Sequence, residues 1–332
     1  MKAIVVHADA EQPRLVWQDA PEPEMGAGEV LVRVRASAVN RADLLQARGG
    51  YAPPSGASPI LGLEMAGDVL AVGDGVAGWQ PGDRVCALLP GGGYAELAVV
   101  PQQMLLRLPD GWTYAQGAAV PEAWYTAFVN LFLEGDLQAG ERTLIHAGAS
   151  GVGTAAIQLA RAAGATVYAT AGTAEKTAQC QMLGAVLAVN YRQEDFGQVI
   201  QQATAGAGVD LILDPVGAAY LARNLALLRP QGRLVSIGLL SGGRAELDMG
   251  LLLGKRLRLI GSTLRNRSLA EKIAITEQFR ERFWPLLAAG ALVPVIDCAF
   301  PMPEAQAAHA YVRQNRNTGK VILTVTDGVG EN

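Results

Sequence analysis

Cysteine is scarce in this chain of 332 residues, which contains only Cys86, Cys180 and Cys298. Their odd number and wide separation exclude a closed disulfide framework and a Cys-x-x-Cys metal site. We interpret each of them as a small buried apolar residue rather than as a reactive thiol.

Long apolar runs and an excess of positive charge are also absent. No segment reaches the ~18 consecutive apolar residues that span a bilayer, and residues 1–7 lead into a strand pattern rather than a signal peptide. The formal net charge is −4, from 27 Lys and Arg against 31 Asp and Glu, which argues against a polyanion-binding surface. We therefore expect a soluble, cytoplasmic protein whose partners are neither membranes nor nucleic acids.

Glycine, by contrast, is abundant and clusters in residues 143–154, Thr-Leu-Ile-His-Ala-Gly-Ala-Ser-Gly-Val-Gly-Thr. An apolar run meets closely spaced glycines and then continues with helical spacing, and a second apolar run follows at residues 165–171. This order predicts a strand, a tight turn and a helix in a βαβ unit. The free N–H groups at such a helix start favour a pyrophosphate, so we interpret the turn as the phosphate grip of a dinucleotide site.

The turn departs from the pattern G-x-G-x-x-G at one position, where Ser150 replaces the second glycine. A serine there implies either a shifted phosphate or one that also accepts a hydroxyl hydrogen bond. The nucleophile elbow G-x-S-x-G also places a serine between strand and helix, but Val152 occupies its last glycine position. The sequence therefore favours a cofactor role for Ser150, with a lesser chance of substrate contact.

The order of predicted elements divides the chain into two domains. Short strands fill the first part; strands and helices alternate from residue 143 to about 263, which predicts a parallel sheet covered on both faces. A last strand then suggests that the chain returns to its first domain. The predicted domains are residues 1–122 with 266–332, and residues 123–265. The predicted helices of the flanking regions are 113–119, 122–134, 269–289 and 303–315, and the last strand is 320–324.

The second strand of the βαβ unit indicates which cofactor binds. An Asp or Glu about 20 residues past the glycines would bind an adenosine ribose hydroxyl, whereas a nearby cation suits a 2′-phosphate. No acid stands at this strand tip, since Glu175 lies beyond it. Gly172 and its small neighbours leave room for a phosphate, and Lys176 supplies charge, so we favour NADPH over NADH. An ordinary solvated lysine at position 176 is the alternative.

The whole chain resembles the zinc-free quinone oxidoreductase branch of the medium-chain dehydrogenase/reductase superfamily. Within that branch it most resembles the p53-inducible quinone oxidoreductase-like group, through residues 89–93, 121–124 and 171–172. The resemblance implies a GroES-like β-rich catalytic domain and a Rossmann doubly wound domain. The matching stretches are residues 38–43 (Ala-Val-Asn-Arg-Ala-Asp), 62–64 (Gly-Leu-Glu), 80–84, 91–96, 119–122, 146–153 and 190–191.

The resemblance also implies that the catalytic metal of related dehydrogenases is missing. Those relatives use an early cysteine and a Gly-His-Glu, and the matching positions here are Asn40 to Asp43 and Gly62-Leu63-Glu64, so leucine replaces the histidine ligand. Zn²⁺ needs several Cys, His or carboxylate ligands. We therefore expect no metal, which argues against alcohol oxidation by Lewis-acid activation.

For catalysis the resemblance implies Tyr51, placed beside the nicotinamide, and Asn40, which would orient the tyrosine or the cofactor amide. A phenol can hydrogen-bond or protonate a forming anion; packing alone is the alternative for Tyr51. Asp43 is interpreted as a helix cap. The histidines His7, His146 and His309 are interpreted as structural. The expected cofactor-binding residues are Ser150, Gly151, Val152, Gly153, Gly172, Lys176, Tyr191, Gly238, Leu239, Leu264, Arg265 and Asn317.

The resulting prediction is an NADPH-dependent quinone reductase, because a quinone accepts hydride without help from a metal. An NADPH-dependent 2-alkenal or enoyl-thioester reductase would use the same cofactor grip and the same tyrosine. A non-catalytic NADPH-binding regulatory or RNA-binding protein is a further alternative, which the acidic balance disfavours. The resemblance also implies a homodimer formed through the edge of the nucleotide-domain sheet.

Overall fold

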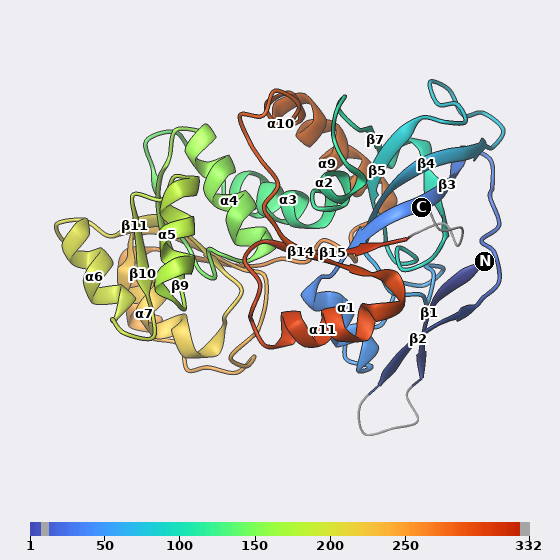
Figure 1. Ribbon diagram of the computed structural model, residues 1–332. Helices are drawn as coiled ribbons and strands as arrows, with labels where there is room; N and C mark the ends of the chain where they lie inside the picture. Colours follow the sequence, from blue (N-terminus) through green and yellow to red (C-terminus); the bar gives the residue numbers. More distant parts are fainter. Residues whose placement is uncertain (8–12, 326–332) are drawn as a thin grey trace. The chain divides into compact units, whose positions relative to one another are not determined.

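The computed structural model describes residues 1–7 and 13–325 and divides into two units (Figure 1). Unit 1 comprises Met1–Ala123 and Arg265–Asn332, and unit 2 comprises Trp124–Leu264. Residues 326–332 of the predicted first domain lie outside the described residues. Each unit has its own sheet and its own hydrophobic core.

Unit 2 contains a six-stranded sheet of order β10-β9-β8-β11-β12-β13, in which every neighbouring pair is parallel. The order reverses between β8 and β11, the point at which doubly wound folds bind ligands. The predicted parallel sheet is therefore confirmed. Its strands are β8 (Arg142–Ile145), β9 (Thr166–Ala171), β10 (Leu187–Asn190), β11 (Val209–Asp214), β12 (Leu228–Ser236) and β13 (Arg258–Gly261).

Helices connect these strands, and right-handed crossovers place them on both faces of the sheet. Burial on both faces explains why β11 reads Val-Asp-Leu-Ile-Leu-Asp with all six residues buried. The core contains Leu144, Phe196, Ile212 and Leu234, among others. The helices are α4 (Gly151–Ala162), α5 (Ala174–Leu183), α6 (Phe196–Ala203), α7 (Leu221–Leu227) and α8 (Met249–Lys255).

Unit 1 is built around strand β3 (Glu29–Ala38), which pairs with three other strands. Val30, Val32 and Val34 are buried on β3, as its alternating pattern predicts. The sheet has the order β14-β15-β3-β4-β5-β7, with β6 also paired to β3, and β1 and β2 form a separate antiparallel pair. The other strands are β1 (Lys2–His7), β2 (Arg14–Asp19), β4 (Glu64–Val72), β5 (Arg84–Leu88), β6 (Leu97–Pro101), β7 (Leu105–Arg107), β14 (Ile296–Pro301) and β15 (Lys320–Thr324).

Strand β15 joins the C-terminal segment to the first part of the chain, because Ile322 is paired with Ala38 of β3. The predicted return of the chain is therefore confirmed. Val321 and Leu323 pack into the core of unit 1. The helices of this unit are α1 (Arg41–Ala47), α2 (Tyr114–Ala118), α9 (Leu269–Arg282), α10 (Trp284–Ala288) and α11 (Ala305–Arg313), and α3 (Pro121–Phe128) begins in unit 1 and ends in unit 2.

The predicted single helix 269–289 is wrong. Helix α9 ends at Arg282, and α10 begins at Trp284 after Phe283 adopts φ −122° and ψ −23°. Pro285 lacks the N–H that would continue the helix and its ring would clash with the preceding turn, so a new helix starts with proline in its first turn. The predicted helix 122–134 also changes character, because residues Val129–Leu133 form a π-helical turn.

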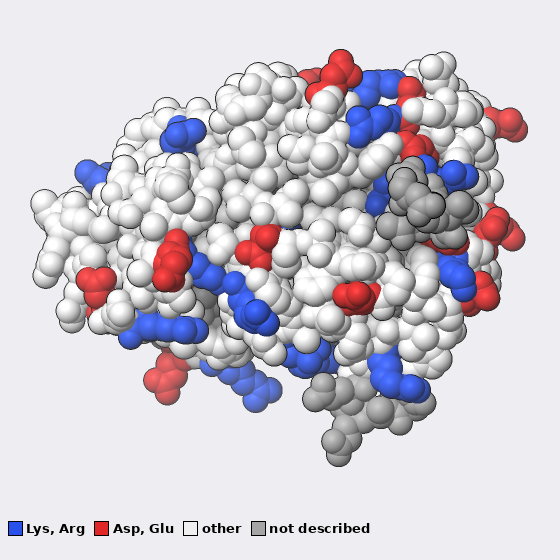
Figure 2. Space-filling model, viewed as in Figure 1, with Lys and Arg blue, Asp and Glu red and all other residues white. Residues whose placement is uncertain are grey.

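On the face shown in Figure 2, acidic and basic side chains are interspersed among uncharged residues. Among the described residues, no helix is both long enough and apolar enough to cross a membrane.

Candidate functional site

The glycine turn of unit 2 lies between β8 and α4. The Ser150 side chain caps α4 by accepting a hydrogen bond from Gly153 N at 3.0 Å. A Cβ atom at Gly153 would lie 2.3 Å from Ala147 O, so only glycine fits there. The turn therefore leaves the N–H groups of the first helical turn in position to hold an anion. Gly151 and Val152, the other predicted residues of this turn, are partly exposed in that first turn.

The role of Ser150 differs in one respect from the expectation. Its hydroxyl oxygen already accepts the Gly153 N–H, so the residue is first a helix cap. The hydroxyl hydrogen remains the group with which Ser150 would meet a phosphate. A serine directly before a predicted helix is a preferred N-cap, and it was the signal for this cap in the sequence.

The carboxyl end of β9 carries the residues predicted for the adenosine end. A Cβ atom at Gly172 would lie 2.8 Å from the Tyr191 hydroxyl, so the missing side chain leaves room for that phenol. Tyr191 is 42% exposed and its ring packs edge-on against Tyr220, with centroids 6.4 Å apart. Lys176 lies in the first turn of α5, where its N–H is 3.3 Å from the Thr173 hydroxyl cap. The start of α5, whose first turn carries Lys176, and the half-exposed Tyr191 thus both lie next to Gly172. A helix start suits a phosphate.

A buried polar network supports the same end of the sheet. His146 is 2.9 Å from Thr170 Oγ1 and 2.8 Å from Asn224 Oδ1, and Asn224 Nδ2 donates to Asp214 at 3.1 Å. Burial lowers the pKa of His146 to about 4, so the ring is neutral at neutral pH. His146 is therefore structural, as predicted, whereas the sequence had not singled out Asn224.

In unit 1, Asn40 belongs to a buried ionic network. Lys320 Nζ lies 2.6 Å from Glu64 Oε1 and 2.7 Å from Asn40 Oδ1, and Asn40 Nδ2 donates to the same Glu64 oxygen at 2.7 Å. Glu64 Oε2 accepts the Glu122 N–H at 2.8 Å. Lys320, Glu64 and Asn40 are thus each bonded to the other two, and these bonds fix the orientation of the Asn40 amide. Lys320 was not predicted, since its partners lie 280 and 256 residues away in sequence.

Asp43 adjoins this network. Its carboxylate accepts Asn40 N at 2.7 Å and Gly62 N at 3.1 Å, which confirms its interpretation as a helix cap. The Tyr94 hydroxyl also lies 3.2 Å from Asp43 and 3.2 Å from His309 Nε2. Burial raises the pKa of Asp43 to about 6 and lowers that of His309 to about 3. His309 is therefore structural as well.

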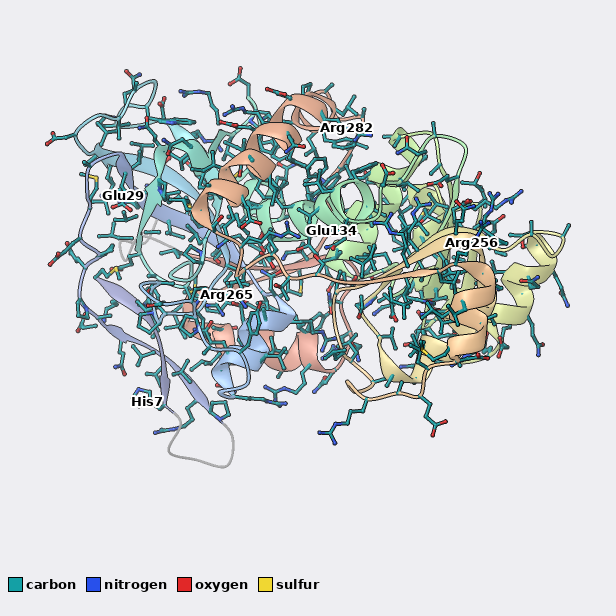
Figure 3. The ribbon with its side chains drawn as sticks, turned by 180° about the vertical axis from the view of Figure 1, so that it is seen from behind. His7, Glu29, Glu134, Arg256, Arg265 and Arg282 are labelled. Carbon is teal, nitrogen blue, oxygen red and sulfur yellow. The ribbon has the colours of Figure 1, made fainter. Side chains whose placement is uncertain are left out.

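Arg265, labelled in Figure 3, is the residue at which the chain returns to unit 1, and Tyr51 lies beside it. The guanidinium carbon is 5.3 Å from the centroid of the Tyr51 ring, and Nη1 donates to Tyr51 O at 3.4 Å. Burial raises the pKa of Tyr51, the nearby Glu122 raises it further, and Arg265 opposes both. Tyr51 is therefore a protonated phenol at neutral pH, the form that can donate to a developing anion.

Asn317, which the sequence also predicted, lies in the loop before β15. Its Nδ2 donates to Gly319 O at 2.7 Å. This bond fixes the side-chain amide beside the start of the strand that carries Lys320.

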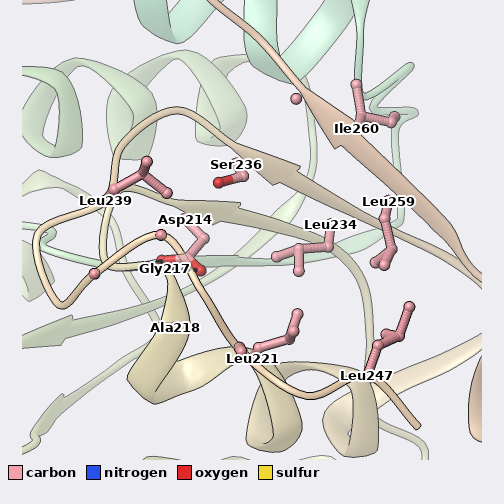
Figure 4. A pocket seen from close by; sticks show the side chains of 14 residues that line it. Asp214, Gly217, Ala218, Leu221, Leu234, Ser236, Leu239, Leu247, Leu259 and Ile260 are labelled. Atoms are coloured by element: carbon pink, nitrogen blue, oxygen red, sulfur yellow. Dashed lines mark hydrogen bonds between the residues drawn. The ribbon is translucent and has the colours of Figure 1, made fainter.

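A cavity of about 360 Å³ lies in unit 2 at the carboxyl ends of β11, β12 and β13 (Figure 4). Leucines from α7, β12, β13 and the loop after β12 line it, together with Asp214 and Ser236. The Asp214 carboxylate is occupied by the N–H groups of Val216 and Gly217. Of the residues predicted to flank the nicotinamide, only Leu239 lines this cavity. Gly238 directly precedes Leu239 in the sequence, and Leu264 is buried.

The residues at the zinc position of related enzymes do not fit a metal. Leu63 is an apolar side chain with 1% exposure, and the Glu64 carboxylate is occupied by Lys320, Asn40 and Glu122 N. Burial raises the pKa of Cys86, which disfavours the thiolate that zinc requires. Within residues 1–7 and 13–325, no three His, Cys, Asp or Glu side chains are grouped so as to hold a metal ion.

Two family profiles match the chain. Residues 26–110 match the family described as alcohol dehydrogenase GroES-like domain, and residues 151–288 match the family described as zinc-binding dehydrogenase. Both elements of the predicted fold class, a GroES-like domain and a Rossmann domain, are thereby confirmed.

Known proteins resemble the chain along most of its length. It is 38% identical to a mycocerosic acid synthase-like polyketide synthase of Mycobacterium tuberculosis, covering 90% of this chain and 14% of that protein. The chain spans only 8% to 14% of the length of the polyketide synthases it matches.

Solved structures cover the whole fold. An NAD-dependent alcohol dehydrogenase has a TM-score of 0.87 at 31% identity, and the Escherichia coli quinone oxidoreductase complexed with NADPH has 0.87 at 28%; each comparison covers 98% of this chain and 100% of the other. The CurK enoyl reductase has a TM-score of 0.83 at 31% identity, covering 94% of this chain and 95% of the other.

Proposed function

Because this chain belongs to the medium-chain dehydrogenase/reductase superfamily, as a quinone oxidoreductase- or enoyl reductase-like oxidoreductase that uses NAD(P)H, we propose that it is an NADPH-dependent quinone reductase acting without a metal. We place it in the zinc-free branch, closest to the p53-inducible group. The motif of residues 121–124, Pro-Glu-Ala-Trp, supports that placement.

The residues next to Gly172, at the carboxyl end of β9, support NADPH as the cofactor. Tyr191 would cover the adenosine end, Lys176 and the N–H groups of α5 would bind a 2′-phosphate, and the capped start of α4 would bind the pyrophosphate. When bound, the cofactor supplies hydride from its nicotinamide ring. The chain has only to orient the acceptor, exclude water and stabilise the charge that develops on it.

Replacing Lys176 with alanine should raise the Michaelis constant for NADPH about tenfold and that for NADH much less, because only NADPH carries the 2′-phosphate. Steady-state kinetics with both cofactors measure this. Arg161→Ala, at the far end of α4, is the matched control and should change neither constant. Equal effects of Lys176→Ala on the two cofactors would remove the argument for NADPH.

Tyr51 is the residue that we propose to donate to the acceptor. Asn40, whose amide is held by Glu64 and Lys320, is proposed to orient the cofactor amide or the tyrosine. The phenol is protonated, lies on a loop rather than in the core, and is held beside a guanidinium. A quinone suits such a site because its reduced form is a comparatively stable phenolate that needs only a hydrogen bond and a proton.

Replacing Tyr51 with phenylalanine should lower turnover about tenfold or more while leaving the affinity for NADPH unchanged, because only the hydroxyl is lost. Tyr311→Phe is the control, since that hydroxyl bonds Asp297 in another part of unit 1. Unchanged turnover in Tyr51→Phe would leave Tyr51 a packing residue.

An enoyl-thioester reductase is the second candidate. The identity of 38% to a polyketide synthase and the similarity to the CurK enoyl reductase favour it. The same tyrosine and cofactor grip would serve a conjugated thioester, whose carbonyl oxygen also gains charge when hydride is added. The two candidate reactions therefore differ only in the size and polarity of the acceptor that the protein reduces.

Oxidation of NADPH in the presence of 1,4-benzoquinone, 9,10-phenanthrenequinone or crotonyl-CoA, measured side by side, tests the assignment. The proposal predicts the highest kcat/KM with a quinone. A higher kcat/KM with crotonyl-CoA would favour the second candidate, and tight NADPH binding without turnover of any acceptor would indicate a regulatory protein.

We also propose a cytoplasmic homodimer that binds neither membrane nor nucleic acid. Strand β13 lies at the end of the sheet order. Exposed apolar side chains occur in the segment that leads to it and in the strand itself: Leu239, Leu240, Leu247, Met249, Leu253 and Leu259. Pairing of two β13 edges would cover them. Sedimentation of the protein and of Leu259→Arg tests this, and a monomeric parent protein would contradict it.

A further inference from the structure

Arg265 carries a buried charge whose hydrogen bonding is incomplete. The residue is 3% exposed; Nε donates to Pro90 O at 2.9 Å, and Nη1 donates to Tyr51 O at 3.4 Å. Nη2 is buried and has no partner among the described residues. A buried charged donor without an acceptor is costly, so this nitrogen needs an oxygen that residues 1–7 and 13–325 do not provide.

The surrounding residues hold the guanidinium in place. Lys272 is 9% exposed, and its Nζ donates to Arg265 O at 2.6 Å, which ties the backbone of Arg265 to helix α9. Two loop carbonyls, at Pro90 and Tyr51, fix the side chain from the other side. A donor fixed in this way does not have to reorganise when charge appears on a ligand, which is the arrangement that stabilises oxyanions.

The charge of Arg265 is not cancelled by the acid near it. Burial raises the pKa of Glu122 to about 8, with Glu64 and Asp43 also raising it and Lys320 and Arg265 lowering it. At neutral pH Glu122 is therefore mostly protonated. Of the acids that act on Arg265, Tyr51 and Glu122 are then neutral and only Asp43 is ionised, while Lys272 adds a second cation. This side of unit 1 therefore still favours an anionic oxygen.

We propose that Arg265, through Nη2, binds the carbonyl oxygen of the hydride acceptor and stabilises the negative charge that forms there. The inference rests on the proposed reductase function. Hydride addition breaks the carbonyl or conjugated π bond of the acceptor and leaves its oxygen with the electron pair; the cofactor is oxidised by two electrons. Tyr51 gives that oxygen a proton and recovers one from solvent. Arg265 gives no proton and remains a cation throughout.

The test uses a stable anion in place of the transient one. 2,4-Dinitrophenolate, titrated into the protein saturated with NADP⁺ and followed by its absorbance, mimics a reduced quinone with a charged oxygen. Arg265→Ala should weaken its binding about 10- to 100-fold, as expected for a hydrogen bond to a charged group, and much more than it weakens the binding of NADPH. Arg265→Lys keeps the charge, so its affinity for the phenolate should lie between those of the parent protein and Arg265→Ala. Arg280→Ala, an exposed arginine of α9, is the control and should behave as the parent protein.

The turnover number of the variants is a second, independent test of the role of Arg265. Methylguanidinium added to Arg265→Ala should restore part of the lost kcat, and should not affect Arg280→Ala. The proposal is overturned if the parent protein does not bind the phenolate, if Arg265→Ala and Arg265→Lys bind it as tightly as the parent, or if their loss is matched by an equal loss of NADPH affinity. If no acceptor is reduced but phenolate binding still depends on Arg265, only the proposed reductase function fails.

Discussion

Replacing Lys320 with methionine is expected to lower the free energy of unfolding by about 3–5 kcal/mol, the largest effect that we predict for a single substitution. Lys320 and Glu64 have side-chain exposures of 5% and 0%, and their ion pair of 2.6 Å is shielded from water. Removing the ammonium leaves a buried carboxylate whose charge no longer has its cation. Denaturant unfolding of the two proteins at neutral pH measures the difference.

Two controls separate the buried ion pair from lysine loss in general. Lys2→Met removes an exposed ammonium 3.6 Å from Asp19 and should cost no more than about 1 kcal/mol. Adding Glu64→Gln to Lys320→Met should recover part of the loss, because the second change removes the unpaired charge. If Lys320→Met and Lys2→Met are equally stable, the network does not stabilise unit 1 in the way described.

Replacing Gly153 with alanine is expected to destabilise the protein by about 1–3 kcal/mol, because the added Cβ would lie 2.3 Å from Ala147 O and 2.7 Å from Gly148 C. Backbone atoms must then move, and the N–H groups at the start of α4 move with them. We expect the dissociation constant for NADPH to rise about tenfold or more, equivalent to at least ~1.4 kcal/mol. Calorimetric titration and thermal unfolding measure the two effects.

Gly254→Ala is the matched control for Gly153→Ala. Gly254 also lies in a helix, α8, but a Cβ there would meet nothing within 4 Å. Alanine should therefore leave NADPH affinity unchanged and raise stability by up to about 1 kcal/mol, the difference in helix propensity. An equal loss of NADPH affinity in both variants would show that the glycine turn has no special role.

Local pattern was enough to predict much of the fold. The alternation of Val30, Val32 and Val34 predicts the buried face of β3, and the glycines after residue 147 predict the turn into α4. The break between α9 and α10 was missed although Pro285 marked it. Helical spacing of apolar residues continues across the proline, so the sequence predicts one helix where the structure has two.

The polar networks of unit 1 could not be predicted in the same way. The bonds of Lys320 to Glu64 and Asn40 join three segments that only the fold of the sheet brings together. Nothing in the sequence around Arg265 indicates that Nη2 lacks a partner among the described residues. The hydrogen bonding of this side chain depends on where the fold places the loop carbonyls of Tyr51 and Pro90. A sequence motif can suggest that Glu122 matters, but only burial next to Glu64 shows why its pKa rises.

We propose above all that this chain binds NADPH and passes hydride to an electron-poor acceptor without a metal. The most direct measurement is turnover of a quinone by protein dialysed against a chelator, with its metal content determined by elemental analysis and its NADPH binding by calorimetry. The account predicts stoichiometric NADPH binding and undiminished quinone reduction with no bound metal. The absence of heat on adding NADPH, or activity that requires a stoichiometric transition metal, would contradict it.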